Sequence, residues 1–242
     1  MTFLSRPPVT LLLALSACFG ACRTAETAAP PTPEASVRPG ANDRFLAADL
    51  DVEEYVGRFE GESREIAVQR AALADTLQLR PGEAVADVGA GTGLFMDLFA
   101  AGVGESGKVF AVELSPAFVE HLQTRAVEGG FDQVQVVHCT DRSVELAPAS
   151  VDSAFICDTY HHFEYPATVM ASLHRALRPG GRLVVVDFER IPGVTREWLL
   201  EHVRAGKEVF RSEIEAAGFE LEDEVDVEGL AENYVLRFRR VD

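Results

Sequence analysis

The sequence predicts one α/β domain built around a mostly parallel sheet. From about residue 84 onward, short apolar runs alternate with helical stretches, which is the pattern of βαβ units joined by right-handed crossovers. A glycine-rich turn at 89–93 directly follows the first apolar run and allows the backbone to approach a ligand closely. With 242 residues, 47% of them hydrophobic, the chain can form one such core and leaves little length for a second.

The expected elements follow one another in a regular order. Apolar residues over 51–79 recur at helical spacing, so we expect helices ahead of the sheet. We expect strands at 84–88, 109–112, 134–137, 153–157 and 182–187. We expect one helix to begin at Leu94 and further helices over 116–128, 166–177 and 198–217. Residues after Gly218, and above all 234–239, alternate as in a terminal hairpin.

The charge of the chain argues against nucleic acid as a partner. Acidic residues outnumber basic ones 39 to 22, which gives a formal net charge of -17. A phosphate backbone is repelled by such a surface except at a local basic patch. We therefore expect no DNA or RNA as the partner, and general solubility is the alternative explanation of the charge.

The first 22 residues have the features of an export signal. Arg6 provides a positive start, residues 9–17 form a short apolar run, and small residues precede Cys18. The apolar run is too short to span a bilayer comfortably. The sequence Leu-Ser-Ala-Cys resembles the lipobox of bacterial lipoproteins, in which the cysteine is acylated. We therefore expect a signal peptide over 1–17 and lipidation at Cys18.

The segment that follows has the composition of a tether. Residues 18–43 are rich in Pro and Ala and carry little apolar surface, so we expect a disordered link to a folded domain over 44–242. The expected location is the bacterial cell envelope, with the lipid anchor holding the protein on a periplasmic or extracytoplasmic face. An uncleaved anchor helix or a misassigned start are the alternatives, and Cys22 is a second, less convincing acylation site.

The spacing of the glycines indicates which nucleotide is bound. A dinucleotide fingerprint requires a glycine at position 94, which is Leu94 here, so a nicotinamide cofactor is disfavoured. Asp87 lies just ahead of the turn, and Glu113 ends the next apolar run. A carboxylate at that strand end can accept hydrogen bonds from two ribose hydroxyls. The pattern therefore predicts an adenosine ribose beside Glu113.

Three motifs together resemble the class I S-adenosylmethionine-dependent methyltransferases. They are Asp87-Val-Gly-Ala-Gly-Thr-Gly93, the acidic Glu113, and Leu177-Arg-Pro-Gly-Gly-Arg-Leu183, and the likeness covers about residues 52–240. The resemblance implies a Rossmann-like fold with a mostly parallel seven-stranded sheet in the order 3-2-1-4-5-7-6 and a terminal antiparallel hairpin. It also implies S-adenosylmethionine as the cofactor and chemistry without a required metal.

The resemblance assigns the cofactor contacts. Gly89, Gly91 and Gly93 would line the methionyl and ribose parts, and Asp87 would face the methionine amino group. A cap for the following turn is the alternative role of Asp87. Further expected cofactor contacts are Glu113, Leu114, Asp141 and Asp158.

Asp141 is the least specific of these cofactor contacts. The family often places an acid after the third strand, where a carboxylate accepts a hydrogen bond from the adenine amino group. Thr140 stands where the family frequently has glycine, so a surface position for Asp141 is the alternative.

The segment after the fourth strand is expected to face the acceptor. It contains His161 and His162, which resemble the paired histidines of many small-molecule methyltransferases. A histidine there could deprotonate a hydroxyl or an amine. Neighbouring residues point in different directions, so at most one is expected to face the methyl group, and a structural role is equally open for each. Trp198, His202 and Arg204 are interpreted as part of an amphipathic covering helix.

The two internal cysteines, Cys139 and Cys157, close the third and fourth expected strands. In the strand order 3-2-1-4 these ends lie about 14 Å apart, which is beyond the reach of a disulfide. We therefore expect free and mostly buried thiols.

Two functions are consistent with these observations. The first is transfer of a methyl group from S-adenosylmethionine to a small-molecule or lipid-like acceptor. The second is a noncatalytic envelope lipoprotein with the same fold, which serves as a ligand-binding or interaction module, because fold alone does not establish activity. Intact candidate cofactor residues, such as Asp87, Glu113 and Asp158, favour the first function.

Overall fold

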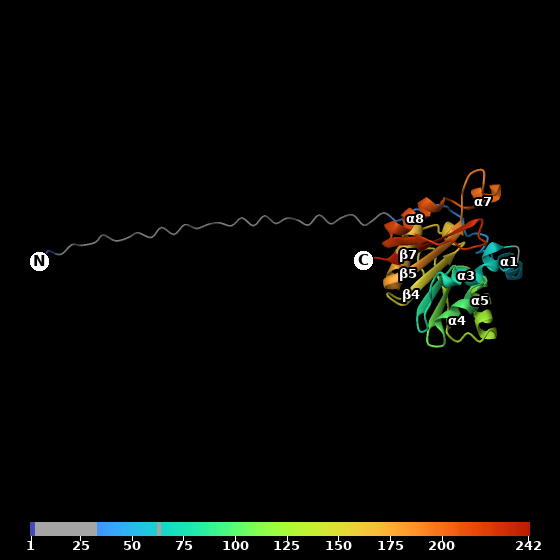
Figure 1. Ribbon diagram of the computed structural model, residues 1–242, viewed down its shortest axis with the longest axis horizontal. Coiled ribbons are helices and arrows are strands. Elements are labelled where there is room, and N and C mark those ends of the chain that lie inside the picture. The colour runs from blue at the N-terminus through green and yellow to red at the C-terminus, as the bar shows by residue number, and fades with distance from the viewer. Residues whose placement is uncertain (3–32, 62–63) are drawn as a thin grey trace. The chain divides into compact units, whose positions relative to one another are not determined.

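The computed structural model describes residues 1–2, 33–61 and 64–242 (Figure 1). The expected signal peptide, the acylation site at Cys18 and most of the expected tether lie outside the described residues. No helix of the described part of the chain is long and apolar enough to cross a membrane.

One seven-stranded sheet forms the framework, in the order β3-β2-β1-β4-β5-β7-β6. Parallel pairing joins β1 to β2 and β4, β2 to β3, and β4 to β5, whereas β7 runs antiparallel to β5 and β6. The predicted fold class, strand order and terminal hairpin are confirmed. The strands are β1 (Ala84–Val88), β2 (Lys108–Glu113), β3 (Val134–His138), β4 (Val151–Cys157), β5 (Leu177–Phe188), β6 (Phe219–Glu224) and β7 (Asn233–Arg240).

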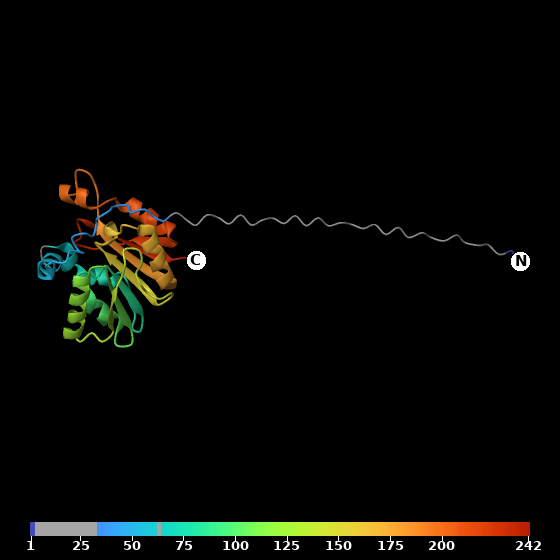
Figure 2. The ribbon, with the colours of Figure 1, turned by 180° about the vertical axis from the view of Figure 1, so that it is seen from behind.

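Helices cover both faces of the sheet, as Figures 1 and 2 show from opposite sides. Alternate residues of β1 enter different cores: Ala86 packs with the residues of α6 and α8, and Val85 packs with those of α3 and α4. Both are fully buried, which explains the uninterrupted apolar run of this strand. The helices are α1 (Val52–Phe59), α2 (Glu65–Val68), α3 (Arg70–Asp75), α4 (Met96–Val103), α5 (Pro116–Glu128), α6 (Pro166–Ala176), α7 (Glu197–His202) and α8 (Lys207–Ala216), with a 3-10 turn η1 (Tyr160–His162).

Two differences from expectation are larger than a shift of one or two residues at an element's end. The strand predicted at 182–187 begins at Leu177, because Leu177 already pairs with Val151 of β4. Residues 178–181, which include Pro-Gly-Gly, form an irregularity in the register before Arg182 pairs with Ser153. The helical stretch predicted over 198–217 is divided into α7 and α8, and Gly206 is the N-cap of the second helix.

The folded unit begins at Glu34, ten residues before the predicted boundary at residue 44. The Glu34 carboxylate accepts hydrogen bonds from the backbone N–H groups of Ala167 and Thr168, at 3.0 and 2.8 Å, in the first turn of α6. This helix has no side-chain N-cap of its own, so a distant residue supplies one. Composition alone predicted a tether here, and these tertiary contacts correct that prediction for residues 34–43.

Candidate functional site

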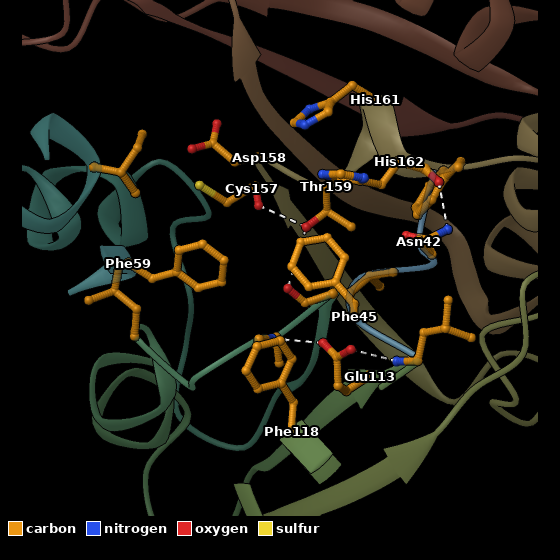
Figure 3. Close-up of a pocket in the computed structure, with 18 of the residues that line it drawn as sticks. Asn42, Phe45, Phe59, Glu113, Phe118, Cys157, Asp158, Thr159, His161 and His162 are labelled. Carbon is orange, nitrogen blue, oxygen red and sulfur yellow. Dashed lines mark hydrogen bonds between the residues drawn. The ribbon is translucent and has the colours of Figure 1, made fainter. Parts of the chain in front are cut away.

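A cavity of about 750 Å³ opens where the parallel strands β1, β2 and β4 end (Figure 3). This is the edge at which open α/β sheets bind their ligands, and the volume is typical of a small-molecule site. Its walls come from the glycine turn, the strand ends, the segment before α1 and the region around α7.

Two glycines of the turn line the cavity, and the third does not. Gly89 and Gly91 line the cavity, both with positive φ, at 76° and 54°. A Cβ on Gly89 would lie 2.3 Å from the methyl group of Thr159, so no side chain fits there. A Cβ on Gly93 would press against Leu122 of α5 at 2.9 Å, so this glycine permits helix packing instead of lining the cavity.

Glu113 is fixed by the turn that it faces. One carboxylate oxygen accepts from Gly91 N–H at 2.8 Å, and the other accepts from Leu114 and Ser115 N–H, each at 2.8 Å. An ionised carboxylate offers roughly four acceptor positions, so about one is left for a ribose hydroxyl. Burial raises the pKa of Glu113, while these backbone N–H groups oppose the shift.

Asp87 lies in the cavity wall with only 4% of its surface exposed. Within the described residues, no side chain or backbone N–H donates a hydrogen bond to its carboxylate. Burial, and secondarily the charge of Glu113, raises the pKa of Asp87 to about 7. A buried carboxyl that lacks a cationic partner and faces a cavity fits the ammonium group of an amino acid ligand.

The expected adenine end of the cavity is more open. Leu114 and Asp141 both line the cavity, and Asp141 is exposed. Cys139 and Cys157 are free thiols that line the same cavity. Both cysteines are partly buried. Burial raises the pKa of each thiol, to about 12 for Cys139. The prediction of free thiols is confirmed.

Asp158 lines the cavity, but both of its carboxylate oxygens already have partners. One accepts from the Arg64 guanidinium and the other from the Asn233 amide at 2.6 Å. Its backbone has φ of 48°, a conformation that is costly for a residue other than glycine. The ion pair with Arg64 and the bond from Asn233 explain why Asp158 stays there. A direct cofactor contact by Asp158 stays a prediction.

The two adjacent histidines have different surroundings, and Figure 3 shows both on the side of Thr159 away from Glu113. His161 is 2% exposed and its Nδ1 lies 2.8 Å from an oxygen of the fully buried Asp187. Asp187 also accepts the backbone N–H groups of His161 and Phe188. Nδ1 of His161 therefore carries the proton, and Nε2 is left as the acceptor.

His162 is placed by the segment before α1. Its Nδ1 lies 3.3 Å from the carbonyl oxygen of Ala41, and its own carbonyl accepts from the Asn42 amide at 3.0 Å. Phe45 packs edge-on against the ring, with centroids 5.2 Å apart. Burial and the neighbouring imidazoles lower the pKa of His162 to about 2, so the ring is neutral at pH 7 and a weak base.

Helix α7 contributes side chains to the cavity, which its sequence did not predict. His202 and Trp198 are four residues apart on one helix face and both line the cavity, whereas Arg204 is paired with Glu213. His202 Nε2 lies 3.2 Å from Nε2 of His161. The i,i+4 spacing could have revealed the shared face, but nothing in the sequence places that face beside His161.

An aromatic cluster extends from the glycine turn, beside Gly91, to His162. Phe45, Tyr55, Phe59 and Phe118 form a contiguous set with ring centroids 5.3–6.3 Å apart. Three of these rings line the cavity itself (Figure 3). Sequence analysis missed Phe45 and Phe118, because they meet only through tertiary contacts between the N-terminal segment and α5.

Comparison with known proteins identifies the central part of the domain. Residues 86–185 match the family model described as "Methyltransferase domain". The ubiquinone/menaquinone biosynthesis C-methyltransferase UbiE of Bordetella avium is 26% identical over 113 residues, which are 47% of this chain and 44% of that protein. An uncharacterized 37.1 kDa protein of transposon TN4556 from Streptomyces fradiae is 34% identical over 116 residues, 48% of this chain and 33% of that protein. The chain thus spans less than half the length of these curated relatives.

Solved structures share the whole fold. A SAM-dependent methyltransferase from Aquifex aeolicus has a TM-score of 0.69 at 23% identity, over 79% of this chain and 99% of that one. Geranyl diphosphate C-methyltransferase from Streptomyces coelicolor has a TM-score of 0.62 at 16% identity, over 87% of this chain and 88% of that one. The described domain therefore has the class I methyltransferase fold, and residues 86–185 within it match the methyltransferase family model.

Proposed function

We propose that this protein transfers the methyl group of S-adenosylmethionine to a small-molecule or lipid-like acceptor. The observation that carries the proposal is one cavity with two chemically different ends. Asp87, Gly91 and Glu113 form a polar end, whereas His161 and Trp198 belong to an end that is partly aromatic.

The polar end suits the cofactor. Asp87, whose carboxylate has no hydrogen-bond partner among the described residues, would face the ammonium group of the cofactor. Glu113 would accept a hydrogen bond from a ribose hydroxyl. Gly91 has no side chain and would therefore leave room for the sulfonium. A bound cofactor supplies an activated methyl group. In the transfer, a lone pair of the acceptor forms the new bond to the methyl carbon while the carbon–sulfur bond breaks and its electrons stay on sulfur. The acceptor loses a proton.

The other end suits an acceptor with an apolar body. Phe188 and Trp198 line it together with the histidines, and Trp198 is 51% exposed at its rim. His161 is the better candidate for receiving the acceptor's proton, because Asp187 would stabilise the resulting imidazolium. The receiving atom would be Nε2, which lies 3.2 Å from Nε2 of His202. His162 is the weaker base of the two because of its lowered pKa.

The relatives support an acceptor of this kind without identifying it. The names of UbiE and of the geranyl diphosphate enzyme refer to isoprenoid-type compounds with long apolar parts. Another structure of this fold is titled as the [4+2]-cyclase SpnF, with a TM-score of 0.62 at 19% identity, so the fold also serves other reactions.

The test is product formation with the full chain. Protein is incubated with methyl-labelled S-adenosylmethionine and a panel of quinones, phenols and isoprenoid lipids, and labelled organic products are separated from unused cofactor. Acceptor-dependent label transfer that is lost in His161→Gln supports the proposal. Cofactor binding with no transfer to any envelope extract would favour the noncatalytic alternative.

We also propose that Cys18 anchors the protein to the cell envelope through a lipid. The support is the Leu-Ser-Ala-Cys pattern after a short apolar run. An envelope enzyme would need cofactor delivered from the cytoplasm, since a charged molecule does not cross a bilayer freely. Fractionation of cells that express Cys18→Ser tests the anchor, with Cys22→Ser as the control. Membrane partition that is unchanged in Cys18→Ser would contradict it.

A further inference from the structure

Three imidazole rings meet at the acceptor end of the cavity. His161, His162 and His202 each present a ring nitrogen, and these three atoms lie within 4.8 Å of one another. The rings come from η1 and from the end of α7, which are about 40 residues apart in the chain. Such a cluster is neither a product of local sequence nor required by the methyltransferase fold.

Two of the rings are oriented from behind by hydrogen-bond acceptors. Nδ1 of His161 donates to Asp187 at 2.8 Å, and Nδ1 of His162 donates to the Ala41 carbonyl at 3.3 Å. Both contacts fix the tautomer and leave Nε2 with a free lone pair. Metal-ligating histidines are held in this way, by a carboxylate or a backbone carbonyl on the other ring nitrogen.

The distance between two of the lone-pair atoms fits a shared ion. Nε2 of His161 and Nε2 of His202 are 3.2 Å apart. Two nitrogens bound to one tetrahedral zinc at about 2.0–2.1 Å lie about 3.3–3.4 Å from each other. A small movement of the His162 ring completes a three-nitrogen set.

The electrostatics of the cluster act in both directions. Arg44 and Arg38 add positive charge nearby, while the ionised Asp187 contributes the opposing negative charge. Arg38 itself is bound to the carbonyl groups of Glu201 and His202, so its donors point away from the imidazoles.

We propose that His161, His162 and His202 bind one divalent transition-metal ion of the Zn²⁺ class, with Asp187 as a positioning residue. Three imidazoles favour Zn²⁺, Co²⁺ or Ni²⁺ over Mg²⁺ and Ca²⁺, which prefer oxygen. Three protein ligands leave a fourth position open toward the cavity, as in catalytic zinc sites. If the proposed function holds, the ion would replace His161 as the group that activates the acceptor, because a metal-bound Nε2 cannot receive a proton. The open position would then bind an acceptor oxygen and lower its pKa.

The experiment measures metal binding directly, in the absence of cofactor and acceptor. Full-length protein without a histidine tag is stripped with a chelator, and Zn²⁺ is titrated by calorimetry. Co²⁺ is added separately to detect the visible absorption of a tetrahedral site. We expect one equivalent of Zn²⁺ to bind and Co²⁺ to give that absorption.

Variants locate the ion. His202→Gln is expected to weaken Zn²⁺ binding at least about 10-fold, and Asp187→Asn by about 10- to 100-fold. His174→Gln is the matched control, because this histidine contacts the Val241 carbonyl on the far side of α6 and is expected to leave affinity unchanged. Circular dichroism confirms that each variant is folded.

Either of two results would overturn the site. Folded wild-type protein that binds no Zn²⁺ would mean that His202 merely donates a hydrogen bond to His161. Equal Zn²⁺ affinity in wild type and His202→Gln would place the ion elsewhere. Cofactor titration of the metal-free protein is a separate readout, so failure of the metal site and failure of the methyltransferase proposal are distinguishable.

Discussion

The two ends of the cavity are built in different ways. The cofactor end comes from short stretches at the ends of β1 and β2, where Gly91 N–H donates to Glu113 and Asp87 lines the same cavity. The acceptor end combines four distant stretches, which include Asn42, His161, Asp187 and His202. A local motif can specify the first end, but the second depends on tertiary packing. Each prediction below perturbs one end and leaves the other as an internal reference.

The largest expected effect is at the cofactor end. Gly91→Val should weaken S-adenosylmethionine binding by at least about 100-fold, or about 2.7 kcal/mol. Its φ of 54° is costly for a branched side chain, which would also extend toward Phe59 within the cavity. Calorimetric titration measures the loss.

Gly130→Val is the matched control for Gly91→Val. It has a similar φ of 65°, and no atom lies within 4 Å of an added Cβ, so it imposes backbone strain without filling the cavity. Equal cofactor affinity in the two variants would remove Gly91 from the site.

The next largest effect is expected from removing residues 34–43, which contact α6 and His162. Deleting residues 1–43 removes the Glu34 cap of α6 and the Ala41 contact to His162. We expect the melting temperature to fall by roughly 5–10 °C, as for a loss of about 2–3 kcal/mol in a domain of this size. Deleting only residues 1–33 is the control. Equal melting temperatures for the two truncations would contradict the conclusion that stabilising contacts begin at Glu34.

These truncations also show what the sequence could and could not predict. The apolar runs, the glycine turn and the family resemblance were sufficient to predict the strand order. They were also sufficient to place Glu113 at a strand end beside the glycine turn. Residues 34–43 have a linker composition, yet Glu34 reaches α6, because one carboxylate can satisfy the free N–H groups of a helix. His202 was interpreted as part of a covering helix, since periodicity shows which face is shared but not what that face meets.

An effect of similar size is expected at the border between the two ends. Arg64→Met should destabilise the fold by about 3 kcal/mol, because it leaves Asp158 buried without its cationic partner. Urea denaturation measures the change. Adding Asp158→Asn to Arg64→Met should restore part of the stability, since no unpaired charge remains. A double variant that is less stable than Arg64→Met would contradict this ion pair as the reason for the buried carboxylate.

The smallest effect is a pH dependence of cofactor binding. The raised pKa of Asp87, about 7, means that its ionised form is lost as the pH falls below neutrality. A cationic ammonium binds the ionised form, so affinity should drop up to about tenfold per pH unit below pH 7. Asp87→Asn should bind weakly with a flat profile between pH 5.5 and 7. An unchanged slope in this variant would assign the titration to another group.

The central claim is that the polar end binds S-adenosylmethionine. Its most direct test is calorimetric titration of the full chain with S-adenosylmethionine and S-adenosylhomocysteine, beside Glu113→Ala and the exposed-site control Glu105→Ala. We predict saturable binding of both ligands at about micromolar affinity, retained in Glu105→Ala and lost in a folded Glu113→Ala. Folded wild-type protein that binds neither ligand would contradict the claim and favour a noncatalytic role for this methyltransferase fold.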